Sequence, residues 1–266
     1  MLVRRSVLVL VSGIGMVFLS VPIAALALRA IETRAWDGLD GAVVSDAVYL
    51  SFITTLLTII ITAIFGTPLA YILARWHFRG RRMISVLVEL PIVLPPAVAG
   101  LALLTTFGRR GVFGPLLESL DVLLPFSTAA VVLAQTFVAA PFYVRAAQIG
   151  FQGVPREIEA AARVDGAGGL TLFALITAPL AARALSAGIV LCWARALGEF
   201  GATILFAGNL QGRTQTMPLL IYSILERDID AAVTTGLLLV GLALIALLLS
   251  QWLGHRADDS DPSTSI

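Results

Sequence analysis

Lysine is absent from this chain of 266 residues, and all 18 of its basic residues are arginine. A Walker A phosphate loop uses a lysine to reach the β- and γ-phosphates of a nucleotide, so this chain does not bind ATP in that way. Cysteine and histidine are almost as scarce, because Cys192, His77 and His255 are the only examples. One cysteine cannot form an internal disulfide, and these three residues are a poor basis for a zinc site. We therefore expect no metal site and no cofactor in this chain.

Catalytic patterns are missing as well. The sequence contains no Gly-x-Ser-x-Gly nucleophile elbow. Its apolar runs lack the Ser/His, paired-Asp or His-x-x-x-x-His arrangement that a membrane-embedded enzyme would need. The net charge is only +1, whereas binding to a nucleic-acid backbone requires a clustered basic surface. We therefore predict a protein that is not an enzyme and has no nucleic-acid partner.

Charge of either sign is rare in this chain. Only 13% of the residues are charged and 58% are hydrophobic, against about 25% and about 45–50% in soluble domains, which indicates an integral membrane protein in contact with the lipid bilayer. A bilayer core about 30 Å thick needs roughly 20 apolar residues per helix. Six runs are candidates: Val7–Leu28, Leu50–Ala74, Ile84–Phe107, Ala129–Val144, Leu185–Ala207 and Ala231–Leu253. We predict an all-α integral membrane protein with about six transmembrane helices in one domain, residues 1–256, and a short, polar, disordered tail, residues 257–266.

Two of the six runs are irregular. The third contains Glu89, Pro91, Pro95 and Pro96, which predicts a kinked or broken helix whose freed carbonyls are satisfied inside the bundle. Pro91, Pro95 and Pro96 are candidates for a hinge that lets this span gate a transport path, with Pro95 and Pro96 as the gate candidates. A static kink that only improves packing is an equally good interpretation. The fourth run is short and carries Pro141.

The arginines predict the orientation, because cytoplasmic loops of membrane proteins are enriched in basic residues. With the N-terminus inside, eleven arginines lie on the inner side: Arg4, Arg5, Arg75, Arg79, Arg81, Arg82, Arg145, Arg156, Arg163, Arg183 and Arg256. Six lie on the outer side: Arg29, Arg34, Arg109, Arg110, Arg213 and Arg227. Both termini are therefore predicted to be cytoplasmic. A cleaved signal peptide is the alternative for the first run, which nevertheless exceeds the usual length of about 7–15 apolar residues.

The segment between the fourth and fifth runs is polar and rich in alanine and glycine. It starts at Pro155, which suits the first turn of a helix, and its acidic residues complement the positive helix N-terminus. Gly166 is placed to end the helix in the left-handed conformation. We predict a short cytoplasmic helix that seats in a groove on another protein. Its polar rim contacts are predicted to be Glu159, Arg163 and Asp165. An ordinary loop helix between two spans is the alternative.

This segment resembles the cytoplasmic coupling loop of bacterial ABC importer permeases, whose pattern is Glu-Ala-Ala, three residues, Gly, nine residues and Ile-x-Leu-Pro. Ala161, Ala162, Gly166, Ile176 and Pro179 are in register. Ala160 takes the place of the motif's Glu, with Glu159 one residue earlier, and Ala178 replaces Leu. The resemblance implies a coupling helix between spans 4 and 5 on which a cytoplasmic ABC ATPase subunit docks, two per complex. The residues implied in docking are Glu157, Glu159, Ala161, Ala162, Arg163, Asp165, Gly166 and Ala167.

Other segments resemble molybdate importer permeases, so that the likeness covers nearly all of residues 50–250. These segments are Leu94–Gly100, Phe107–Gly111, Arg195–Thr203 and Gly208–Leu219. Sulfate and thiosulfate permeases share the Gly-Glu-Phe-Gly-Ala core, while the Arg-Ala-Leu-Gly prefix and the Gly-Arg-Arg-Gly loop favour molybdate. The resemblance implies a homodimeric permease of the bacterial or archaeal cytoplasmic membrane, importing molybdate, with tungstate as a further candidate. Its other implied partner is a periplasmic or lipid-anchored oxyanion-binding protein.

Charged residues inside the predicted spans are candidates for the path of the anion, because ionisable groups in a membrane usually face the bundle interior or an aqueous cavity. Arg195 and Glu199 are four residues apart, on one face of the predicted fifth helix. In one interpretation they form a gate with Pro95 and Pro96, where Arg195 attracts the oxyanion and Glu199 holds Arg195 in place. In the other they are a self-neutralised pair that packs helices or anchors the dimer.

Several further interpretations remain open. Arg109 and Arg110 either attract anions to an outer vestibule or are solvated residues of a glycine-bounded turn. The apolar segment Leu219–Leu225 is too short to span and is predicted to be re-entrant or interfacial. A sulfate or thiosulfate permease is the nearest alternative function. A stand-alone channel or ion-coupled carrier is the more distant alternative. Its candidate residues for conduction or ion coupling are Glu89, Arg195 and Glu199.

Overall fold

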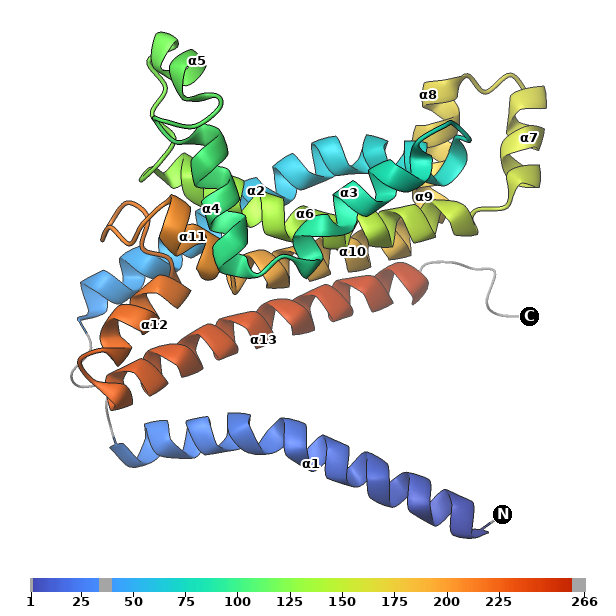
Figure 1. Ribbon diagram of the computed structural model, residues 1–266. Helices are drawn as coiled ribbons and strands as arrows, with labels where there is room; N and C mark the ends of the chain where they lie inside the picture. The colour runs from blue at the N-terminus through green and yellow to red at the C-terminus, as the bar shows by residue number, and fades with distance from the viewer. Residues whose placement is uncertain (1, 34–39, 260–266) are drawn as a thin grey trace.

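The computed structural model describes residues 2–33 and 40–259, which fold into helices and connecting loops without a strand (Figure 1). Within these ranges the prediction of an all-α protein is confirmed. Arg34, one of the arginines counted as outer, and residues 260–266 of the predicted tail lie outside the described residues. The last helix extends to Asp259, so the first three residues of the predicted tail, Ala257–Asp259, are helical.

The helices follow one another in a simple order. They are α1 (Leu2–Thr33), α2 (Gly41–Arg75), α3 (Arg81–Val93), α4 (Pro96–Phe107), α5 (Gly114–Ser119), α6 (Thr128–Gly153), α7 (Arg156–Val164), α8 (Gly169–Leu172), the π-helix η2 (Phe173–Thr177), α9 (Ala178–Leu180), α10 (Ala182–Leu197), α11 (Gly201–Phe206), α12 (Met217–Leu225) and α13 (Ile229–Asp259). Helix α12 coincides with the short apolar segment predicted at 219–225.

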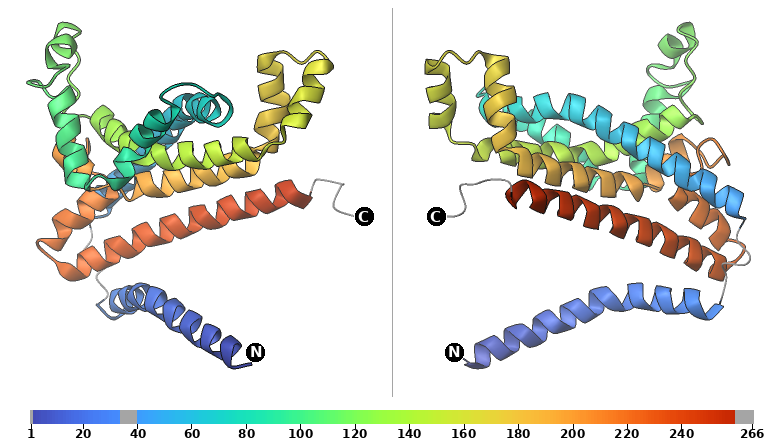
Figure 2. Two further views of the ribbon diagram at one scale, coloured as in Figure 1. Left: turned by 45° about the vertical axis from the view of Figure 1, so that its right-hand side comes forward. Right: turned by 180° about the vertical axis from the view of Figure 1, so that it is seen from behind.

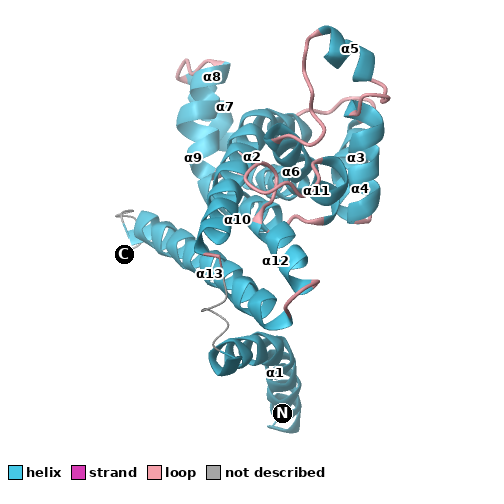
Figure 3. Ribbon diagram, turned by 90° about the vertical axis from the view of Figure 1, so that its left-hand side faces the viewer, coloured by secondary structure: helices cyan, strands magenta, loops and turns pink. Residues whose placement is uncertain are grey.

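The centre of the bundle consists of α2, α6 and α10, which lie side by side along their lengths (Figure 3). Small residues allow this close approach. A Cβ atom on Gly66 of α2 would lie 3.0 Å from the ring of Tyr143 in α6, and one on Gly150 of α6 would lie 2.4 Å from the Cβ of Ala184 in α10. A side chain at Gly150 would therefore clash with α10, and one at Gly66 would require the ring of Tyr143 to shift.

Helix α6 is longer than the short run predicted at Ala129–Val144, because polar residues beyond the run find partners in the bundle. Gln148 donates a hydrogen bond to the carbonyl of Leu73 at 3.5 Å. Arg145 forms an ion pair with Glu89 of α3 at 3.3 Å. The helix continues through Pro141 and ends at Gly153.

The predicted third and fifth spans are both broken. Helices α3 and α4 meet at 116° across Leu94 and Pro95, which confirms the predicted break. The prediction of one helix over Leu185–Ala207 is wrong, because α10 ends at Leu197 and α11 begins at Gly201. Gly198 ends the first helix, and the carboxylate of Glu199 then accepts a hydrogen bond from the backbone N–H of Ala202 at 2.7 Å, capping the second.

Three helices of the described residues are long and apolar enough to cross a bilayer, namely Leu8–Thr33 of α1, α2 and α6. Two bent pairs, α3 with α4 and Gly169–Leu180 with α10, raise the number to five at most. The apolar part of α13, Ile229–Ile245, is shorter. The exact count of six spans therefore stays a prediction. Helix α1 lies apart from the central bundle and contacts α13 only near the C-terminal end of α1 (Figure 2). There Ala30 is buried and Arg29 forms an ion pair with Asp230 at 2.8 Å.

Candidate functional site

The segment α7–α9 projects from one end of the bundle, opposite to the end that carries α5 (Figure 1). As predicted, Pro155 directly precedes α7 and Gly166 follows it in the left-handed conformation, with φ of +89°. The N–H of Gly166 donates to the carbonyl of Arg163 at 3.1 Å, and the N–H of Ala167 donates to the carbonyl of Ala162 at 2.9 Å. This pair of bonds is a Schellman motif, so the helix has a defined end.

Most of the predicted docking residues are accessible, with one exception. Glu157, Ala161, Arg163, Asp165 and Gly166 are exposed, and Ala162 and Ala167 are partly buried. The prediction that Glu159 lies at the rim is wrong, because its side chain turns into the bundle and the residue is only 4% exposed. There it pairs with Arg75 at 3.0 Å and accepts a hydrogen bond from the hydroxyl of Thr177 at 2.8 Å.

Large apolar side chains are exposed beside α7, and the sequence analysis missed them. Val164, the last residue of α7, is 88% exposed. Leu170 of α8 and Leu175 of η2 are exposed as well. Large exposed apolar surfaces are typical of protein interaction sites, and these three side chains are the candidates for such a surface near α7. The sequence offered a weak signal only at Val164, a single apolar residue between Arg163 and Asp165, whereas Leu175 lies in an apolar stretch whose exposure no local pattern reveals.

A second candidate site lies where α10 breaks. Arg195 Nη2 is 2.7 Å from Glu199 Oε2, so the predicted pair is present. The prediction that both residues share one helix face is wrong, because Glu199 lies in the break between α10 and α11. The side chain of Glu199 is 1% exposed and that of Arg195 is 28% exposed. The guanidinium is therefore the accessible member of the pair, and the carboxylate lies behind it.

The two helix breaks pack against each other. A Cβ atom on Gly201, the first residue of α11, would lie 2.5 Å from the Cβ of Pro96, the first residue of α4. One on Gly100 would lie 2.8 Å from the carbonyl oxygen of Ala202. The structure thus places Pro95 and Pro96 beside the segment that follows Glu199. The two breaks are thus interlocked, without room for a larger side chain at Gly100 or Gly201.

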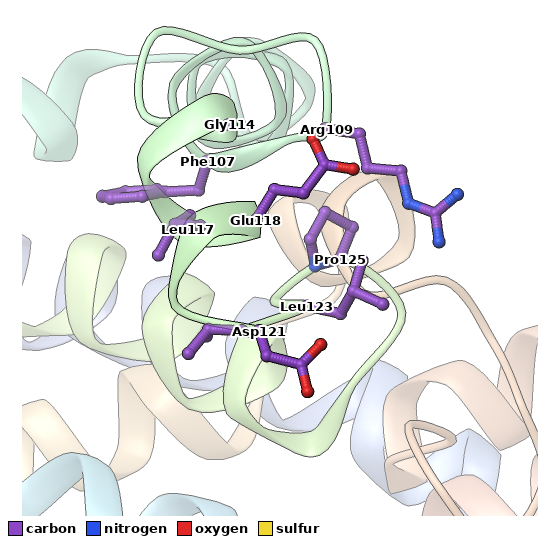
Figure 4. Close-up of a pocket in the computed structure, with 9 residues that line it drawn as sticks. Phe107, Arg109, Gly114, Leu117, Glu118, Asp121, Leu123 and Pro125 are labelled. Carbon is purple, nitrogen blue, oxygen red and sulfur yellow. The ribbon is translucent and has the colours of Figure 1, made fainter.

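Arg109 and Arg110 lie in the loop after α4, and both are exposed. Arg109 lines a cavity of about 200 Å³ that Glu118 and Asp121 also line. Figure 4 shows Glu118 beside Arg109 and Asp121 farther away, beyond Leu123 and Pro125. The negative charge of the two carboxylates offsets the charge of Arg109, so this cavity is not a purely cationic vestibule. Within residues 2–33 and 40–259, no three His, Cys, Asp or Glu side chains are placed to hold a metal ion.

The family model of the binding-protein-dependent transport system inner membrane component matches residues 66–259. The chain belongs to this family. Together with the apolar helices, membership makes the chain a multi-pass protein of the inner membrane and a component of a transport system.

Relatives and solved structures agree with this assignment. The molybdenum transport system permease protein ModB of Mycobacterium tuberculosis is 42% identical over 88% of this chain and 89% of its own length. The sulfate transport system permease protein CysW of Synechococcus elongatus is 32% identical over 91% of this chain and 86% of its own. A bacterial alginate ABC transporter, solved in complex with an alginate pentasaccharide-bound periplasmic protein, has the same fold, with a TM-score of 0.79 at 16% identity over 96% of this chain and 94% of that one.

Proposed function

We propose that this chain is the membrane-spanning permease subunit of an ABC importer for molybdate, with tungstate as a further candidate substrate. The exposed apolar side chains on and after α7, Val164, Leu170 and Leu175, are the observation that carries the proposal. A permease without a nucleotide site of its own needs a surface on which an ATPase docks, so that conformational changes of the ATPase are transmitted to the permease. The higher identity to a molybdenum permease than to a sulfate permease, 42% against 32%, supports molybdate as the substrate.

In the proposed mechanism two copies of the chain form the path between them, and each copy docks one ATPase on α7 at the cytoplasmic face. An oxyanion-binding protein docks on the opposite face, and both termini are cytoplasmic. ATP binding and hydrolysis shift the dimer between outward-open and inward-open states, so that the permease works by alternating access. ATP hydrolysis itself takes place in the separate ATPase subunits.

The pair of Arg195 and Glu199 is proposed to lie at the gate. The accessible guanidinium attracts the oxyanion, and the buried carboxylate orients it without facing the anion. The unequal exposure of the two side chains, 28% and 1%, supports this role. A pair that only packs helices within one chain would be expected to have both side chains buried, and a pair that anchors the dimer stays the alternative.

The docking proposal predicts that Val164→Glu releases the ATPase. Covering an exposed valine stabilises a complex by about 1.5–3 kcal/mol, so replacing it with a charge is expected to weaken binding roughly 10-fold to 100-fold. The tagged chain is purified in detergent from its native membrane, and the nucleotide-binding subunit and the ATPase activity of the eluate are measured.

The matched control is Val112→Glu, because Val112 is 80% exposed and lies at the opposite end of the bundle. This variant is expected to retain the ATPase. If the wild-type chain elutes alone under conditions that keep a known transporter complex intact, the importer proposal fails and a channel or carrier becomes the better interpretation. If both variants bind equally well, α7 is not the docking element.

A sulfate or thiosulfate importer is the second candidate, favoured by the similarity to CysW. The two functions predict different stimulation of the assembled complex. With its ATPase and binding protein present, we expect molybdate to stimulate ATP hydrolysis at concentrations at which sulfate has no effect. The reverse order would assign the chain to sulfate transport, and equal stimulation would indicate a general oxyanion importer.

A further inference from the structure

The only buried residue of α7 is a charged one, Glu159. Its Oε1 atom is 3.0 Å from Nη2 of Arg75, the last residue of α2, and accepts the Thr177 hydroxyl at 2.8 Å. The same guanidinium donates to the carbonyl of Val154, just before α7, at 3.0 Å. The first two contacts join α7 to the end of α2 and to η2. The third joins the end of α2 to Val154, between α6 and α7.

Burial makes this connection selective. The side chains of Arg75 and Glu159 are 8% and 5% exposed, so both charges are removed from water. A buried ion pair adds little net stability, since its desolvation offsets its attraction, but losing one partner is strongly unfavourable. The pair therefore holds one arrangement of α7 and penalises any other in which the two residues separate.

Further contacts join the elements that surround the pair. The carbonyl of Leu73, two residues before Arg75, accepts from Arg81 at 2.8 Å as well as from Gln148. On the η2 side, the rings of Tyr71, Phe151 and Phe173 contact one another with centroid separations of 5.2–5.9 Å. Edge-on aromatic contacts of this kind stabilise packing beyond their buried area. The start of α3 and the helices α2, α6 and η2 are thus tied together beside Glu159.

The links of α7 along the chain are weak by comparison. It is joined to α6 through an extended Val154 and Pro155, and to α8 through a segment that contains Gly166 and Gly168. Its remaining residues are exposed or partly buried. Without the polar contacts, a force applied to α7 would be absorbed in these two connections.

We infer that Arg75, Glu159 and Thr177 form a latch that makes α7 and η2 move as one body with α2 and α6. The latch transmits a displacement of the coupling helix into the membrane-spanning bundle. Glu159 is thus a positioning residue and does not contact the ATPase. The π-helical turn at η2 fits this role, because such turns occur frequently at functional sites. The inference rests on the proposed function and adds to it the step between ATPase docking and movement of the path.

The test uses the whole transporter, reconstituted in lipid vesicles with its ATPase and binding protein. Glu159→Gln removes the charge of the carboxylate but keeps an acceptor for Thr177. We expect it to bind the ATPase and hydrolyse ATP like the wild type, while the number of molybdate ions taken up per ATP falls roughly tenfold, within the usual range of coupling between sites. The control is Glu89→Gln, which breaks an exposed pair worth little and is expected to keep the wild-type ratio.

Thr177→Val is the second variant, because it is nearly isosteric and leaves the ion pair intact. It is expected to lower the molybdate uptake per ATP by a smaller factor. If Glu159→Gln does not accumulate as folded protein, the uptake per ATP of Thr177→Val tests the latch instead. The latch is refuted if Glu159→Gln weakens ATPase binding but leaves uptake per ATP unchanged, or if the folded variants keep the wild-type ratio. A wild-type chain that binds no ATPase would instead refute the proposed function, so the two failures are distinguishable.

Discussion

Replacing Gly100 with leucine is expected to separate α4 from α11 and to destabilise the permease strongly. A Cβ atom at this position would lie 2.8 Å from the carbonyl oxygen of Ala202 and 2.9 Å from the Cβ of Leu205. The first of these is a backbone atom, which cannot rotate away as the end of a flexible side chain can. Overpacking of a well-packed site costs typically about 1–3 kcal/mol, and a leucine adds three further carbon atoms.

The measurement is the thermal denaturation midpoint of the purified chain in detergent. At about 2–4 °C per kcal/mol for a chain of this size, Gly100→Ala is expected to lower it by several degrees, and Gly100→Leu to prevent accumulation of the folded protein. Gly236→Ala is the matched control, because no atom lies within 4 Å of the added Cβ and alanine favours the helix interior. A Gly100→Leu variant as stable as the wild type would mean that the two helix breaks are not interlocked.

Removing both charges at the break of α10 is expected to abolish transport without unfolding the protein. Glu199→Ala alone leaves the guanidinium of Arg195 without its partner and removes the cap of α11. Breaking a buried ion pair lowers the free energy of unfolding by about 3–5 kcal/mol, and the loss is smaller here because solvent screens the partly exposed Arg195. Loss of the helix cap lowers it further, by about 0.5–2 kcal/mol. The double variant Arg195→Gln/Glu199→Gln avoids an unpaired charge and is expected to fold.

Uptake by the double variant distinguishes the two roles of the pair. If Arg195 attracts the oxyanion, vesicles with the folded double variant take up molybdate at a small fraction of the wild-type rate, because no cation faces the path. If the pair only packs helices, the folded fraction of the double variant takes up molybdate at the wild-type rate. Size-exclusion profiles and ATPase binding, measured on the same preparations, show whether the variant is folded.

Local signals in the sequence predicted α7 well, because its two ends depend on residues next to them. Pro155 is suited to a helix start, and Gly166 can adopt the left-handed conformation that closes the helix. The direction in which Glu159 points depends on how α7 packs against the bundle. Its partners, Arg75 and Thr177, lie on other elements, and no local pattern relates them to it. The rim contact was therefore predicted wrongly although the helix was predicted correctly.

Hydropathy was a weaker guide to the fifth span. The run Leu185–Ala207 is apolar on both sides of Glu199, so an average over the window shows one continuous helix. The break is stabilised by the backbone N–H of Ala202, which donates a hydrogen bond to the carboxylate of Glu199. This contact spans three residues and has no effect on hydropathy. In the third span, Pro95 and Pro96 predicted the break directly, because proline interrupts a helix.

The exposed side chains of Val164 and Leu170 also bear on how the complex is assembled. In the proposed orientation, a newly inserted copy that has no ATPase presents these apolar groups to the cytoplasm. Chaperones and proteases recognise uncovered apolar surface of this kind, so surplus copies are open to removal while assembled ones are shielded. The docking surface would then also keep the supply of the permease matched to that of its ATPase.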